Sequence, residues 1–156
     1  ARLEALAASA APGAGTAWPE LAGWPAQGEE LVLPSARLLA ATARRAVAGE
    51  APAVVATGFH ATFSALVASL TAEVARGAGL VPGSRGTSVA FGGGCLVNRL
   101  LRDGLRAELQ SRGVGVLLPM AVPPGDGGLA YGQAVLGAVA CARGSEPRHL
   151  GGDRCA

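Results

Sequence analysis

The chain has 156 residues, half of them hydrophobic, and a formal net charge of +2. This length suits one domain with its own core, and interspersed charges without a basic stripe argue against a nucleic-acid-binding protein. No uncharged apolar run reaches the roughly 18 residues that a membrane span requires. The three cysteines lack Cys-x-x-Cys spacing, which excludes a zinc knuckle and favours a reducing compartment, so we expect a soluble cytoplasmic protein without membrane or nucleic-acid partners.

Residues 1–50 predict a helical lead-in that is interrupted by a connector rich in Pro and Gly. The opening "ARLEALAASA" is typical of a short helix, and residues 11–29 are typical of irregular chain with two Trp anchors. A second helix is expected from Ser35, acting as its N-cap, to Gly49. The side chains that would face the core share one side of that helix: Leu38, Leu39, Thr42 and Ala46.

Residues 51–143 are expected to form the main part of the fold. The stretch "GFHATFSALVASLTAEVARGAG" repeats apolar residues at three- and four-residue spacing and predicts the clearest amphipathic helix of the chain. Its expected core positions are Phe59, Phe63, Leu66, Val67, Leu70 and Val74.

A strand, a helix and a second strand follow within about 30 residues and predict a βαβ unit with parallel strands. The strands are "TSVAF" and "VGVLLP", and the helix runs from about Leu96 to Arg112. The helix should turn inward Val97, Leu100, Leu101, Leu105 and Leu109.

The longest uncharged apolar run, residues 129–142, predicts a buried last helix. Small residues in it would permit close packing on the sheet: Gly132, Ala134, Gly137 and Ala138. Residues 144–156, which include His149 and Cys155, show little hydrophobic patterning and are expected to fray. The fold class is therefore α/β, with a parallel βαβ unit and several packed helices.

Two glycine-rich turns are the candidates for a binding site. Gly92, Gly93 and Gly94 end the first strand, where their N–H groups suit an anion, although a tight turn with close packing also explains them. Asp126, in "PPGDGG", follows the second strand and should face the same crevice, because parallel strands end side by side. A cation bridging Asp126 and nucleotide phosphates fits there, and an N-cap is the commoner role for an Asp at that position.

Three further side chains have chemical alternatives. Asn98 suits a nucleotide contact or an ordinary helix cap. His60 suits a metal ligand, a proton carrier, a nucleotide contact or a satisfied structural histidine. Cys95 suits a nucleophile at a helix amino end, but no His lies near it in sequence, and we favour a small buried residue.

The stretches "GFHATFSALV", "SVAFGGGCLVNRLL" and "VLLPMAVPPGDGGLAYGQAV" together resemble the carboxyl-terminal part of HypF, the carbamoyltransferase of NiFe-hydrogenase maturation. The resemblance implies part of an actin/Hsp70-like (ASKHA) domain, with residues 1–143 as its carboxyl-terminal portion and residues 51–143 as a nucleotide-binding subdomain. In that family a carbamoyl group passes from carbamoyl-adenylate, made from carbamoyl phosphate and ATP, to the carboxyl-terminal cysteine of HypE, as a cyanide precursor. Gly92, Gly93, Gly94 and Asn98 would then bind the nucleotide, Asp126 a divalent Mg, Fe or Zn ion, and His60 would be the candidate catalytic residue.

The chain departs from that family pattern in several places. The family's His-x-x-x-His metal pair and its first ASKHA half have no counterpart here, so we expect a portion of the enzyme, with the remainder of the enzyme as a partner, that cannot transfer the group alone. Transfer to a small metabolite or a tRNA, and a non-catalytic nucleotide-binding or interaction remnant, are the alternatives.

Overall fold

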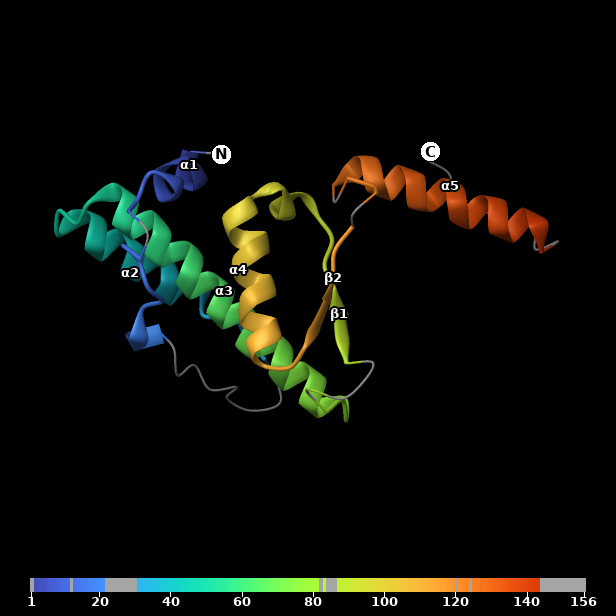
Figure 1. Ribbon diagram of the computed structural model, residues 1–156, viewed down its shortest axis with the longest axis horizontal. Coiled ribbons are helices and arrows are strands. Elements are labelled where there is room, and N and C mark those ends of the chain that lie inside the picture. The colour runs from blue at the N-terminus through green and yellow to red at the C-terminus, as the bar shows by residue number, and fades with distance from the viewer. Residues whose placement is uncertain are drawn as a thin grey trace, which may run out of the picture.

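The computed structural model describes residues 2–11, 13–21, 31–81, 83, 87–119, 121–123 and 125–143. Part of the predicted connector and the whole predicted frayed tail lie outside these residues. The elements in chain order are α1 (Arg2–Ala8), η1 (Pro19–Leu21), α2 (Ser35–Val47), α3 (Pro52–Gly77), β1 (Ser88–Ala90), η2 (Gly94–Val97), α4 (Arg99–Ser111), β2 (Gly115–Leu117) and α5 (Asp126–Ala142) (Figure 1).

Helix α3 is the centre of the helical body, because α1, α2 and α4 all pack on it. It begins with Pro52 in its first turn, where the missing N–H costs no hydrogen bond. The prediction of an amphipathic helix with one apolar stripe is wrong: Val74 is 53% exposed, Phe59 and Phe63 are only half-buried, and buried residues surround the axis because three helices cover it. These buried residues are mostly small: Val55, Ala56, Gly58, His60, Thr62, Ser64, Leu66, Ala68, Ala72 and Ala75.

By length and composition alone, α3 is apolar enough to cross a membrane. From the sequence we expected no stretch that could do so, because only uncharged apolar runs were counted. In this structure 44% of its most apolar 18-residue window is buried inside the protein. A core helix covered by neighbours explains the same composition, because each covered side needs apolar residues.

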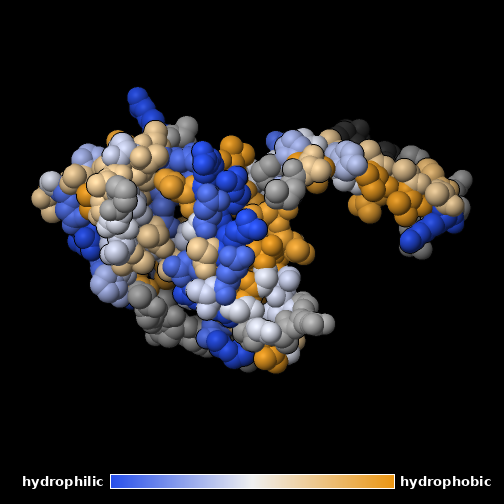
Figure 2. Space-filling model, viewed as in Figure 1, coloured by the Kyte–Doolittle hydropathy of each residue, from blue (hydrophilic) through white to orange (hydrophobic). Residues whose placement is uncertain are grey.

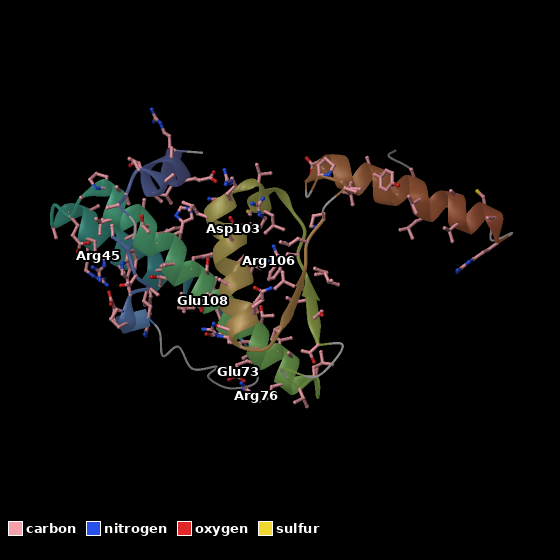
Figure 3. The ribbon with its side chains drawn as sticks, viewed as in Figure 1. Arg45, Glu73, Arg76, Asp103, Arg106 and Glu108 are labelled. Carbon is pink, nitrogen blue, oxygen red and sulfur yellow. The ribbon has the colours of Figure 1, made fainter. Side chains whose placement is uncertain are left out.

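The connector and α2 pack on the first half of α3 through Trp18. Its indole lies against Gly58, where a Cβ atom would come within 2.4 Å of Nε1. Arg45 lies over the Trp18 ring at 4.7 Å and forms ion pairs with Glu20 at 2.9 Å and Glu50 at 3.0 Å (Figure 3). The pKa of Glu20 is lowered, first by a backbone hydrogen bond to its carboxylate and then by the hydrogen bond from Arg45.

Helix α2 differs from its prediction at both the cap and the core face. Ser35 is its first residue, Pro34 precedes it as N-cap, and no side chain caps it. Leu38 is buried as predicted, but Leu39 is 62% exposed and Ala46 is also exposed. Ala41 is buried instead, because it lies one turn after Leu38 and both residues pack in the cluster that includes Val55 of α3.

Strands β1 and β2 confirm the predicted parallel pair, with Ser88 opposite Gly115 and Ala90 opposite Leu117. Helix α4 joins them and buries Leu105 and Leu109 as predicted. Val97 is 69% exposed, against the prediction, because the helix begins at Arg99 and Val97 belongs to the preceding η2 turn. The solvent side of α4 is hydrophilic and presents Asp103, Arg106 and Glu108 (Figures 2 and 3).

Helix α5 extends away from the body, and hydrophobic residues cover much of its visible surface (Figures 1 and 2). None of its residues is buried, so the prediction of a helix buried on the sheet is wrong. The turn after β2 directs the chain away from the two-stranded sheet, which α5 therefore does not cover. Its exposed large apolar side chains are Leu129, Tyr131, Val135, Leu136 and Val139.

Leu109→Ala should lower the free energy of unfolding by about 2–5 kcal/mol, because Leu109 is fully buried against Ala68 and Val114 and its loss leaves a cavity. Urea denaturation followed by circular dichroism measures this change. Leu136→Ala, at a side chain that is 71% exposed, is the matched control and should cost less than about 0.5 kcal/mol. Equal losses in the two variants would contradict the assignment of the core.

Candidate nucleotide-binding site

The two glycine-rich turns meet at one pocket. It has a volume of about 490 Å³, and its lining includes Gly92, Gly93, Gly94 and Asp126. A Cβ atom on Gly125 would lie 3.8 Å from the Cα of Gly94, so the two turns lie close together. Figure 1 shows the start of α5 beside the ends of the parallel strands. The structure confirms that both turns face one crevice.

The conformation of the first turn requires glycine at only one of its three positions. Gly93 has φ 103° and ψ 158°, a region that only glycine adopts readily. Close packing does not explain the triplet, since a Cβ atom at Gly92, Gly93 or Gly94 would meet nothing within 4 Å. The glycines therefore border open space, in which a ligand can approach the backbone N–H groups.

Asp126 is the first residue of α5 and lies on the opposite side of the pocket. Gly125 is the N-cap, and no side chain caps this helix, so the commoner role of Asp as N-cap is not the one seen. Gly128 lets the double-proline turn fold back, because a Cβ atom there would lie 2.1 Å from the carbonyl oxygen of Pro123. The amino end of α5, with its partial positive charge, therefore borders the same pocket as the glycines.

Apolar and aromatic side chains that our sequence reasoning missed complete the lining. Phe91 stands between β1 and the glycines, and Tyr131 lies five residues after Asp126. Their positions next to the two motifs are a signal that sequence reasoning had available. Such surfaces suit a flat ring such as a purine base, and the pocket volume is in the range of small-molecule sites, about 300–1,000 Å³.

Asn98 and His60 lie behind the glycine turn and are not among the residues that line the pocket. Asn98 is the N-cap of α4: its Oδ1 accepts the N–H of Leu101 at 3.0 Å. Glu4 of α1 accepts the N–H of Arg99 at 2.8 Å. The amino end of α4 is thus already occupied by two side chains, and the pocket is bordered instead by the glycine turn and the start of α5.

His60 is buried and makes two hydrogen bonds. Its Nδ1 lies 2.8 Å from the carbonyl oxygen of Ala56, and its Nε2 lies 2.9 Å from Nδ2 of Asn98. The structure thus unites two predicted site residues in one contact. A direct catalytic role for His60 stays a prediction, and its position is that of a satisfied histidine.

Cys95 contradicts its prediction, because it is exposed instead of buried. The reason is local: η2 turns Leu96 into the core, at 5% exposure, and leaves its neighbour Cys95 outside.

A complete protein-derived metal site is absent from the described residues, which contain no group of three or more His, Cys, Asp or Glu side chains. Tetrahedral zinc sites need three or four protein ligands, so this set does not fit zinc. Mg²⁺ instead binds through one or two carboxylates together with substrate phosphates and waters. Asp126 beside a phosphate-sized space fits that second mode.

Gly93→Ala should destabilise the chain by about 1–3 kcal/mol, because alanine must adopt a backbone conformation that is strained for any residue with a Cβ atom. Gly92→Ala is the matched control, with open space around it and no positive φ, and should cause no loss. Urea midpoints of the two variants measure the difference. Equal stability would mean that the turn has another conformation.

Comparison with known proteins places these motifs in a family. The profile for "Carbamoyltransferase, Kae1-like Domain, second subdomain" matches residues 1–133. The chain is 47% identical over 76 residues to carbamoyltransferase HypF of Rhizobium leguminosarum bv. viciae, covering 48% of this chain and 9% of that protein. It is 42% identical over 76 residues to a carbamoyltransferase HypF homolog of Cupriavidus necator, covering 49% of this chain and 18% of that protein.

The fold has a solved counterpart. The crystal structure of T. kodakarensis HypF matches with a TM-score of 0.61 and 23% identity, over 91% of this chain and 17% of that one. This likeness confirms the α/β, ASKHA-like class of the fold. The chain spans less than a fifth of the length of these three proteins. With its profile match, its glycine and aspartate turns and this fold, the chain belongs to the HypF carbamoyltransferase family, as the second subdomain of the Kae1-like domain.

Proposed function

We propose that this chain binds the adenylate part of carbamoyl-adenylate, as one portion of a HypF-like carbamoyltransferase. The complete enzyme would form this adenylate from carbamoyl phosphate and ATP, and would pass the carbamoyl group to the carboxyl-terminal cysteine of a HypE-like protein. The observation that supports the proposal most is that the Gly92–Gly94 turn and the start of α5 lie close together and line one pocket. Membership of the carbamoyltransferase family supports the reaction class.

The pocket offers each part of an adenylate a suitable surface. Backbone N–H groups of the glycine turn and of the first turn of α5 would hold the phosphate, since a glycine-rich turn and a helix amino end both suit an anion. Phe91 and Tyr131 would contact the base. Neither wall contains a nucleophile in a suitable setting, so the residues described act by binding and orientation.

The transfer step itself needs only the acceptor thiolate and the bound adenylate. The sulfur would form a bond to the carbamoyl carbon while the bond from that carbon to the phosphate oxygen breaks, and AMP would leave with the electron pair. Donors fixed around the phosphate would stabilise the charge that AMP gains. The chain's contribution is therefore to hold the leaving group.

Mg²⁺ is the cofactor that the donor set supports. Asp126 would supply one carboxylate oxygen, and the phosphate and water would supply the others. When bound, the ion would neutralise phosphate charge that the nearby Asp126 carboxylate otherwise repels. Fe or Zn at this place would require ligands from another part of the enzyme, because the described residues contain no suitable cluster.

The remainder of the enzyme is the proposed partner, and α5 is the proposed contact. A helix that is apolar on all sides is normally covered by a larger protein, yet α5 has no buried residue. Asp126 is its only charged residue. The matching family profile is named a second subdomain, so a first subdomain is the natural cover. Because α5 starts at the pocket, the same contact would close the pocket.

Asp126→Asn should remove the effect of Mg²⁺ on AMP binding. In the unaltered chain, Mg²⁺ should raise AMP affinity about tenfold, which corresponds to one charge-assisted contact of about 1.4 kcal/mol. Isothermal titration calorimetry with and without Mg²⁺ measures this. Asp103→Asn, at an exposed carboxylate on α4, is the control and should keep the effect. An equal Mg²⁺ effect in Asp126→Asn, or no AMP binding to the unaltered chain, would contradict the site.

The purified 156-residue chain should not carbamoylate a HypE tail peptide when given carbamoyl phosphate and ATP, because it spans less than a fifth of the HypF proteins that it matches. Mass spectrometry of the peptide measures the transfer, with HypF of Rhizobium leguminosarum as the active control. A peptide heavier by one carbamoyl group after incubation with the chain alone would show that the other parts are not needed.

A further inference from the structure

We infer that His60 is a positioning residue, which holds the glycine turn in place through Asn98. This inference rests on the proposed function only for the consequence on nucleotide binding. Its structural part concerns three hydrogen bonds, one within α3, one within the start of α4 and one between the two, and these bonds determine which atoms of the two side chains carry hydrogen.

The first bond defines the tautomer of the ring. Nδ1 of His60 lies 2.8 Å from the carbonyl oxygen of Ala56, which can only accept a hydrogen bond. Nδ1 must therefore carry the proton. The ring is 6% exposed and its edge meets the Phe59 ring, with centroids 5.8 Å apart at 87°, so its plane is held by packing.

The second and third bonds define the orientation of the Asn98 amide. The backbone N–H of Leu101 can only donate, so the atom of Asn98 facing it at 3.0 Å must be the oxygen. The amide nitrogen then faces Nε2 of His60 at 2.9 Å and donates to it. Nε2 of His60 is thus the acceptor of this bond, because a reversed amide would place two donors together at the Leu101 N–H.

The pair connects the core helix to the pocket. His60 belongs to α3, and Asn98 lies four residues after Gly94, at the junction of η2 and α4. The backbone N–H of Asn98 donates to Cys95 at 3.1 Å, and its carbonyl accepts from Arg102 at 3.0 Å. Fixing Asn98 therefore fixes both η2, which starts with Gly94, and the first turn of α4.

This arrangement also explains how a polar ring can be buried in the core helix. A histidine without these partners would cost free energy in the core, because burial of an unpaired polar group is unfavourable. Because both ring nitrogens have hydrogen-bond partners, this cost is avoided, and the ring also holds the Asn98 amide in one orientation. The pair sets the turn, and the turn sets where the glycine N–H groups point.

Three variants of the full chain test the inference. His60→Leu removes the acceptor. His60→Gln keeps one, because the Gln side-chain oxygen reaches about as far as Nε2. Thr62→Val is the matched control, since Thr62 is also buried on α3 and bonds to the N–H of Trp18 at 2.8 Å, away from α4.

The primary readouts do not require a ligand. Nitrogen-15 spectra of the unaltered chain should show His60 protonated on Nδ1 and unprotonated on Nε2. In His60→Leu, the Leu101 amide should exchange its hydrogen about tenfold faster, the factor that one ordinary hydrogen bond corresponds to, and the Gly93 and Gly94 amide signals should move. His60→Gln should largely restore the slow Leu101 exchange and the original Gly93 and Gly94 signals. Thr62→Val should change neither the exchange rate nor these signals.

The nucleotide readout separates this inference from the proposed function. AMP affinity should fall about tenfold in His60→Leu and less than about threefold in His60→Gln. A proton on Nε2, or equal Leu101 exchange and Gly signals in all three variants, would overturn the positioning role. If AMP binds to no form while the spectra behave as expected, the proposed function fails and the His60–Asn98 contact stands as positioning of the turn alone.

Discussion

The covering of α3 on several sides is the constraint on which the rest of the structure depends. Because α1, α2 and α4 all pack on this one helix, most of its buried residues are small, and its buried His60 and Thr62 have hydrogen-bond partners. Gly58 leaves room for the Trp18 indole, and the Thr62 hydroxyl accepts a hydrogen bond from the backbone N–H of Trp18. His60 meets Asn98 in the same way. The core helix is thus also connected, through His60 and Asn98, to the turn that lines the pocket.

Local patterns predicted the elements well and their surroundings poorly. The two short strands, their parallel pairing and the inward face of α4 were all predicted, because strand and helix periodicities depend on nearby residues. The burial of α3 and the exposure of α5 were not. Both helices are apolar on most sides, and only tertiary contacts distinguish one that is covered within this chain from one that is not.

For the site, the sequence predicted the meeting of the two turns but not its details. Parallel strands end side by side, so Gly94 and Asp126 had to be neighbours. Within the Gly92–Gly94 turn, only Gly93 needs a glycine conformation, and this depends on backbone angles. Glu4 of α1 occupies the amino end of α4 through a contact between residues 95 positions apart. No local pattern contains that information.

The uncovered α5 has a thermodynamic consequence for assembly. Water now surrounds Leu129, Leu136 and the neighbouring apolar side chains, and its release when a second body covers them makes the heat-capacity change of association negative. Hydrophobic association of this kind weakens on cooling. If the other half of the domain covers this helix as proposed, the association of the two halves would be weaker in the cold.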